Sequence, residues 1–139
     1  MRVPLKEGLF TMPADPGAAR LLGSRCLSCT RWNFPAQSLC PYCSREGCAT
    51  MPLSPRGVVE VCTTVVNRPP GYEGKIPFGF GVVELPEGIR LIARMTDPDR
   101  SPPGTPVRLV LEPLYIDTEG REVITYAYEP LTGAVDGGP

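Results

Sequence analysis

Two short cysteine motifs are the residues of this chain best suited to chemistry. Cys26-Leu27-Ser28-Cys29 and Cys40-Pro41-Tyr42-Cys43 each hold two residues between their cysteines, and ten residues separate the two motifs. A C-x-x-C turn points both sulfurs at one ion, and two such turns close a tetrahedral four-sulfur site. We therefore predict one structural zinc per chain, with four ligands: Cys26, Cys29, Cys40 and Cys43.

The spacing leaves alternatives to zinc open. Iron in a rubredoxin-like site would use the same four sulfurs, and in an oxidising compartment the same cysteines would form two disulfides. The segment from Cys26 to Cys43 has too few apolar residues to build a core. A bound metal would therefore be what holds this segment folded.

The remaining cysteines and the chain's start favour a cytoplasmic protein. We find no signal-peptide pattern and no apolar run long enough to cross a bilayer. Six cysteines without an export signal fit a reducing compartment, so Cys48 and Cys62 are expected to be free thiols. Cys48 follows the second motif and is a candidate surplus ligand, whereas Cys62 lies in a β-branched run and is expected to be buried.

The composition argues against two classes of function. The net charge is −1, whereas a nucleic-acid-binding protein usually carries a basic excess, although zinc ribbons and OB-type barrels often bind nucleic acids. The chain has no histidine, so it cannot by itself supply the cysteine and histidine pair that a thiolase site requires. We predict no independent catalysis. Solvated charge is the expected role of the carboxylates at predicted turns and strand ends: Glu84, Glu87, Asp97 and Asp99.

The elements that must position the cysteines are β-strands. A short strand over 21–25 leads into the first motif, and prolines argue against a long helix in residues 1–20. Five further strands are predicted over 57–67, 78–85, 89–95, 107–112 and 122–128, with a proline-rich loop over 68–77. Five strands with no helix between them predict a small closed OB-type barrel, although their spacing also fits a small sandwich.

The order of several motifs carries a family resemblance. After the cysteine motifs come 67–70 (NRPP), 77–85 (PFGFGVVEL), 88–94 (GIRLIAR), 104–107 (GTPV) and 126–130 (YAYEP). In this order they resemble the acyl-CoA-associated OB-fold family with a rubredoxin-like zinc ribbon, long catalogued as a domain of unknown function. The resemblance covers roughly residues 21–130. Two departures are visible: Thr30 and Ser44 stand where the family often has glycine, and residues 1–20 match the family's helical amino-terminal region weakly.

The resemblance implies a mainly β fold, with an N-terminal rubredoxin-like zinc ribbon followed by a five-stranded OB-fold barrel. The expected units are a partner-docking segment (1–20), the zinc ribbon (21–51), the barrel (52–130) and a flexible tail (131–139). Members of the family accompany thiolases, acyl-CoA-condensing synthases, and aldolases of sterol side-chain breakdown; some accompany thiolases of anaerobic aromatic degradation. The resemblance thus implies a non-catalytic subunit in a hetero-oligomer with a thiolase-fold enzyme, or alternatively with an acyl-CoA aldolase or hydratase.

Two loops are candidates for contact with CoA or with the partner enzyme. Arg31 and Trp32 lie between the cysteine motifs, where a guanidinium and an aromatic ring could bind a phosphate and an adenine. Phe34 is expected instead to wedge the ribbon onto the barrel, and the same role is the open alternative for Trp32. The second loop offers positive charge and apolar rings on a chain stiffened by prolines; its candidates are Arg68, Tyr72, Lys75 and Phe78.

Overall fold

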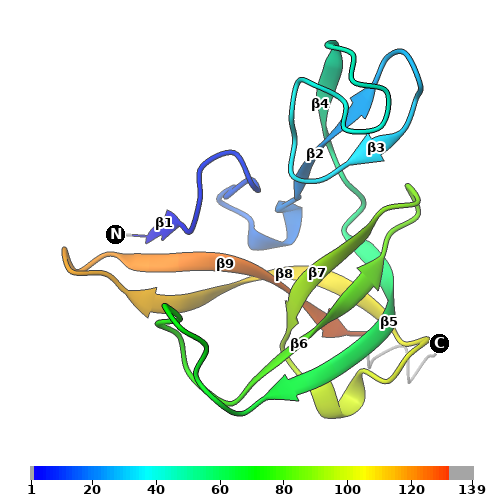
Figure 1. Cartoon of the computed structure of the whole chain (residues 1–139). Coiled ribbons are helices and arrows are strands. Elements are labelled where there is room, and N and C mark those ends of the chain that lie inside the picture. Colours follow the sequence, from blue (N-terminus) through cyan, green and yellow to red (C-terminus); the bar gives the residue numbers. More distant parts are fainter. Residues whose placement is uncertain (1, 132–139) are drawn as a thin grey trace.

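Five strands close into a barrel in the second half of the chain, as the sequence predicts. The computed structural model describes residues 2–131. Its barrel strands are β5 (Arg56–Val65), β6 (Phe78–Glu84), β7 (Arg90–Met95), β8 (Pro106–Ile116) and β9 (Glu122–Pro130). β6 pairs with β5 and β7, and β8 pairs with β5 and β9, all antiparallel, while β7 and β9 pair parallel and close the ring (Figure 1). This is the strand order of an OB-fold.

Alternation along the strands decides which side chains fill the barrel. In β6 the inward position Val83 is fully buried, whereas the outward position Phe80 is 39% exposed. β5 carries a bulge between Val59 and Val61. A Cβ at Gly81 would collide with the carbonyl oxygen of Val61, so the bulge requires glycine at this place on the neighbouring strand.

The ribbon is a second, smaller sheet with the strand order β3-β2-β4. β2 (Leu22–Cys26) confirms the predicted strand that leads into the first cysteine motif. β3 (Trp32–Asn33) and β4 (Cys48–Pro52) were not predicted, because both are short and neither shows an alternating pattern. β4 depends on its non-local pairing with β2 along five residues.

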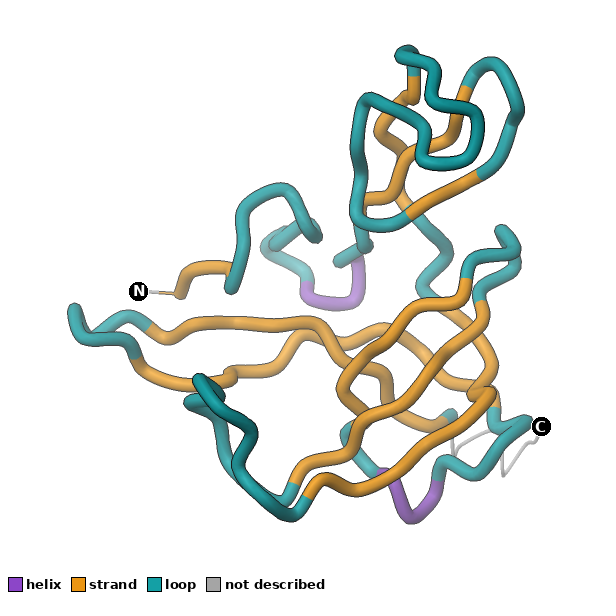
Figure 2. The backbone as a smooth tube through the Cα atoms, in the orientation of Figure 1, coloured by secondary structure: helices purple, strands orange, loops and turns teal. Residues whose placement is uncertain are grey.

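The amino-terminal residues pack on the chain's own barrel. β1 (Arg2–Pro4) pairs parallel with the start of β9, and Phe10 bridges to Leu21 (Figure 1). Figure 2 shows the two short 3₁₀ helices in purple: η1 (Pro16–Ala18) before the ribbon and η2 (Pro98–Arg100) after β7. None of the helices within residues 2–131 has the length and apolar character needed to cross a membrane. The predicted tail (131–139) lies outside the described residues except for Leu131.

The ribbon and the barrel share one hydrophobic core. Leu21 and Leu53 lie at the base of the ribbon, are each 1% exposed, and belong to the same buried cluster as the barrel residues. Phe34 packs edge-on against Tyr126 of β9, with ring centres 5.9 Å apart, which confirms its predicted role as a wedge.

Glu87 corrects one expectation from the sequence. We expected a solvated carboxylate in the turn between β6 and β7. Instead its Oε2 accepts a hydrogen bond from the backbone N–H of Ser54 at 2.8 Å, and its Oε1 is buried. The carboxylate ties the segment that follows the ribbon to a barrel hairpin, because residues 33 positions apart in sequence meet there.

Truncating Leu53 should destabilise the whole chain rather than the ribbon alone. We expect Leu53→Ala to lower the free energy of unfolding by about 2–5 kcal/mol, since it opens a cavity in the shared core. Leu27→Ala is the matched control, because Leu27 is 72% exposed and its loss should change stability by less than about 0.5 kcal/mol. Urea denaturation measures both, followed by the fluorescence of the ribbon's Trp32 and by circular dichroism, to which the barrel strands contribute. A transition lowered for Trp32 alone, or equal effects of the two variants, would contradict the shared core.

Candidate functional site

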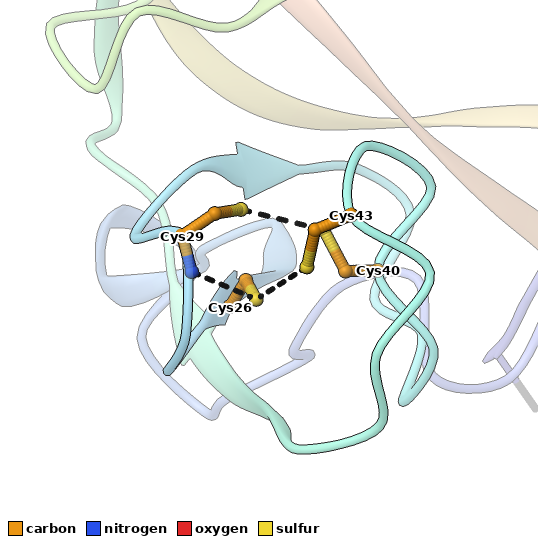
Figure 3. Close-up of side chains that lie close together, drawn as sticks. All are labelled: Cys26, Cys29, Cys40 and Cys43. Carbon is orange, nitrogen blue, oxygen red and sulfur yellow. Dashed lines mark hydrogen bonds between the residues drawn. The ribbon is translucent and has the colours of Figure 1, made fainter.

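Four cysteine sulfurs meet at the outer end of the ribbon. The sulfurs of Cys26, Cys29, Cys40 and Cys43 all lie within 4.8 Å of one another (Figure 3). The Cys26–Cys43 and Cys29–Cys40 pairs are each 3.6 Å apart. A tetrahedron with zinc–sulfur bonds of about 2.3 Å has sulfur–sulfur edges of about 3.8 Å, so the observed spacing fits a zinc ion. The four predicted ligands form the site for one structural zinc.

The two cysteine motifs are built alike. In the first, the N–H of Thr30 donates to the carbonyl of Cys26 at 2.9 Å; in the second, Ser44 donates to Cys40 at the same distance. Thr30 and Ser44 have φ values of 64° and 62°, which lie in the left-handed region. These are the positions where the resembled family often has glycine, and a left-handed φ is the physical reason for that preference.

Backbone N–H groups prepare the buried sulfurs for a metal. The Cys26 sulfur accepts from the N–H of Ser28 at 3.3 Å and from that of Cys29 at 3.4 Å. The Cys29 N–H is the largest cause of a pKa lowered to about 6 at Cys26, while burial acts in the opposite direction. The N–H of Cys43 likewise lowers the pKa of Cys40, again against burial. The N–H groups of Cys29 and Cys43 therefore favour the thiolate forms of Cys26 and Cys40, and the thiolate is the form that binds zinc.

The two other cysteines do not belong to this group of four sulfurs. Cys48 begins β4 directly opposite Cys26. Burial is the largest cause of the raised pKa of its thiol, and the charges of Cys26 and Cys40 raise this pKa further. Cys62 lies in the barrel, half-buried on β5, with its sulfur 4.0 Å from the Pro98 carbonyl. Burial raises the pKa of Cys62 as well.

A cleft of about 510 Å³ lies where the ribbon meets the barrel. Trp32 and Tyr42 line it from the ribbon, and Arg90 lines it from β7. The Arg31 guanidinium stacks on the Tyr42 ring, with its carbon 4.9 Å from the ring centre. Arg25 covers Trp32 in the same way at 5.7 Å. This cleft, named here the junction cleft, therefore has aromatic walls with two arginines stacked on them, while its own lining arginine, Arg90, pairs with Glu60 at 2.7 Å.

A second cleft of about 710 Å³ opens on the barrel, beside the loop that follows β5. Lys75, Phe78 and Arg94 are among its lining residues. Arg94 is half-buried; it pairs with Glu112 at 2.8 Å, and it donates to the Tyr72 hydroxyl at 2.8 Å. We name this the barrel cleft.

Two of the contact residues predicted on the second loop, Arg68 and Tyr72, form hydrogen bonds within that loop. Arg68 donates to the carbonyls of Tyr72 and Gly74, at 3.2 and 2.7 Å. The Tyr72 hydroxyl donates to the carbonyl of Lys75 at 2.9 Å. Arg68 and Tyr72 thus stabilise the loop conformation, and this leaves Lys75 and Phe78 as the members of the set that line the cleft.

The structure does not bring the two predicted sets of contact residues together. Arg31 and Trp32 lie at the ribbon, whereas the loop over 68–77 lies at the opposite end of the barrel (Figure 1). Sequence reasoning missed Tyr42, Arg90 and Arg94. Only Tyr42 gave a sequence signal, as an aromatic residue inside a cysteine motif; the other two acquire their neighbours through strand pairing.

Two family models match this chain in chain order. The ChsH2 rubredoxin-like zinc ribbon domain matches residues 15–47, and the ChsH2 C-terminal OB-fold domain matches residues 50–112. Among curated relatives, the benzoylsuccinyl-CoA thiolase subunit BbsA of Thauera aromatica is 30% identical over 128 residues, covering 88% of this chain and 85% of the relative. A DUF35 domain-containing scaffold protein of Pyrococcus furiosus is 30% identical over 115 residues, covering 81% and 84%.

A solved structure agrees with this similarity. The chain resembles one from a structure titled "Ltp2-ChsH2(DUF35) aldolase", with a TM-score of 0.59 and 28% sequence identity, over 80% of this chain and 84% of that chain. The match extends across both the ribbon and the barrel, because it covers more of the chain than either module contains.

Replacing one zinc ligand should remove the metal. We expect purified wild-type protein to hold one zinc per chain and Cys40→Ser to hold none, because three sulfurs cannot complete the tetrahedron. Elemental analysis of the metal measures this. Cys62→Ser is the control and should keep its zinc; full zinc occupancy in Cys40→Ser would contradict the assignment.

Glycine should stabilise the left-handed position after the second motif. Ser44→Gly removes a backbone cost of about 1–2 kcal/mol, partly offset by the greater freedom of glycine in the unfolded chain. We expect a net gain of about 0.5–1 kcal/mol in the free energy of unfolding of the zinc-loaded protein. Ser28→Gly is the matched control: Ser28 is also exposed but lacks a left-handed φ, so this change should lower stability.

Proposed function

Because the chain belongs to the ChsH2-type DUF35 family of zinc ribbon and OB-fold proteins, we propose that it is a non-catalytic subunit of an acyl-CoA-processing enzyme complex. Its partner is a thiolase-fold enzyme, and the subunit helps to position the CoA thioester. The observation that carries the proposal is the match to a thiolase subunit along nearly the whole chain. The aldolase title of the similar solved structure supports the alternative, a complex with an acyl-CoA aldolase.

The chemistry of the thiols supports an accessory role. A nucleophilic cysteine needs an activating base, and the sequence contains no histidine. The two cysteines outside the zinc site have raised pKa values, so both are protonated near neutral pH. Bond cleavage is therefore assigned to the partner enzyme.

The junction cleft is the better candidate for contact with CoA. Two arginines stack on the aromatic rings that line it, Arg25 on Trp32 and Arg31 on Tyr42, and within residues 2–131 neither forms an ion pair with a carboxylate. Arg20, Arg45, Arg56 and Arg68 also form none within these residues, whereas six arginines do form such pairs: Arg2, Arg90, Arg94, Arg100, Arg108 and Arg121. Unpaired guanidinium groups beside aromatic rings suit a ligand with phosphates and an adenine.

The barrel cleft is the second candidate for the same ligand. Lys75 forms no ion pair within the described part of the chain, and Phe78 offers an aromatic face beside it. Its other cation, Arg94, is already engaged by Glu112, as Arg90 of the junction cleft is by Glu60. The junction cleft is preferred because Arg25 and Arg31 lie beside its aromatic rings without such a pair. Partner contact is the role proposed for Lys75 and Phe78.

A co-purification experiment tests the proposed complex. We expect tagged protein recovered from its native host to carry a stoichiometric thiolase-superfamily enzyme, identified by mass spectrometry. Recovery of an aldolase or a hydratase would instead select the alternative complex, and recovery of the isolated chain alone would contradict both. The reconstituted complex, and not the isolated chain, should then convert acyl-CoA substrates.

Steady-state kinetics of the reconstituted complex tests the CoA contact. Arg31→Ala should raise KM for the acyl-CoA substrate about 10- to 150-fold with kcat unchanged, since a charged hydrogen bond contributes about 1.5–3 kcal/mol to uniform binding. Arg45 occupies the equivalent place after the second cysteine motif, so Arg45→Ala is the matched control and should leave KM unchanged. A KM effect in Lys75→Ala but not in Arg31→Ala would assign CoA to the barrel cleft.

A further inference from the structure

Cys48 lies next to the zinc site without belonging to it. β4 pairs antiparallel with β2, and in this register Cys48 is directly opposite Cys26. Its side chain is half-buried. Residues directly opposite in a sheet project from the same face, so the Cys48 side chain lies beside that of Cys26. The chain thus carries a fifth sulfur beside a four-sulfur site.

The backbone geometry of this pair suits a disulfide. The Cys26 N–H donates to the Arg31 carbonyl, and the Cys48 N–H donates to the Ser38 carbonyl, both away from the opposite strand. Cys26 and Cys48 therefore form a non-hydrogen-bonded pair, the type with the shorter separation of about 4.5 Å between Cα atoms. A disulfide joins Cα atoms about 4.4–6.8 Å apart, and both side chains project from the same face of the ribbon sheet.

We propose that Cys48 is an oxidation site: a peroxide links its sulfur to that of Cys26 in a disulfide, and zinc leaves the ribbon. Cys26 is both a zinc ligand and the cross-strand neighbour of Cys48, so its sulfur cannot serve both bonds. The inference depends on the zinc site and not on the identity of the partner enzyme.

The reaction balances with one peroxide. The peroxide oxidises one of the two sulfurs to a sulfenic acid, its O–O bond breaks, and one water is released when hydrogen peroxide is the oxidant. The second sulfur attacks the sulfenic sulfur, the S–S bond forms, and hydroxide leaves. The two cysteines lose two electrons, the peroxide gains them, and the proton of the Cys48 thiol ends on water.

The consequence for the ribbon is the loss of one corner of the tetrahedron. Cys29, Cys40 and Cys43 remain as three ligands, and three thiolates hold zinc less tightly than four. The segment between the motifs has no core of its own, so its fold is lost with the metal. Trp32 and Tyr42 then leave the wall of the junction cleft, and a thiol reductant with added zinc reverses the change.

Peroxide-driven zinc release tests the proposal on the full-length, zinc-loaded protein. Wild type, Cys48→Ser and Cys62→Ser are each treated with hydrogen peroxide, with a chromogenic chelator reporting free zinc. We expect wild type and Cys62→Ser to release zinc at the same rate, and Cys48→Ser to release it about tenfold more slowly because it lacks the neighbouring thiol. Peptide mapping after alkylation should find the Cys26–Cys48 disulfide in both faster proteins.

Three results would overturn the proposal. The first is release from Cys48→Ser at the wild-type rate. The second is a peptide map with disulfides only inside the two motifs, Cys26–Cys29 and Cys40–Cys43. The third is Cys48→Ser protein that holds no zinc before oxidation, since Cys48 would then be a ligand. The serine variant keeps the size of the side chain, and its zinc content before treatment reports whether the ribbon is folded.

Discussion

The fold of the ribbon depends on the tetrahedral coordination of one zinc ion by four cysteine sulfurs. The larger apolar side chains from Cys26 to Cys43 face solvent or the barrel, and Leu27, Leu39 and Tyr42 are 72%, 47% and 56% exposed. No core can therefore form within the segment. Its conformation is fixed by four sulfurs and by the N–H groups that each motif aims at its first cysteine.

The ribbon and the barrel are one structural unit because their apolar residues merge. Leu21 and Leu53 extend from the two ends of the ribbon into the cluster that fills the barrel. The Phe34–Tyr126 contact and the Glu87–Ser54 hydrogen bond join the same two modules at other points. The junction cleft has a defined shape for this reason: its two walls come from different sheets that cannot move independently without exposing buried surface.

The charges of the chain are divided between two uses. Barrel arginines pair mostly with carboxylates on neighbouring strands, as Arg94 does with Glu112. Arg25 and Arg31 of the ribbon stack on aromatic rings instead, on Trp32 and Tyr42. An exposed ion pair contributes only about 0–1 kcal/mol to stability, and an exposed cation–π contact a similar amount. Whether an arginine pairs with a carboxylate or stacks on a ring therefore affects stability little. It affects ligand binding more, because an arginine on an aromatic ring keeps its full charge available to a phosphate.

The sequence by itself determined the features that depend on local spacing. The two C-x-x-C motifs identified all four zinc ligands, since a tight turn sets where its sulfurs point whatever surrounds it. Runs rich in β-formers between proline- and glycine-rich turns located the five barrel strands, and the order of the motifs identified the family. Thr30 and Ser44 stood out as departures from glycine, although only their φ values gave the physical reason.

The tertiary structure decided the features that depend on partners distant in sequence. The register of β2 and β4 placed Cys48 beside Cys26, and no local pattern encodes that pairing. Arg31 and Lys75 looked equivalent as cations on loops, yet the fold put them at different clefts on opposite sides of the barrel. Arg68 looked free and is used to hold its own loop. Strand pairing and core packing set these neighbours, because both select contacts by geometry in space rather than by distance along the chain.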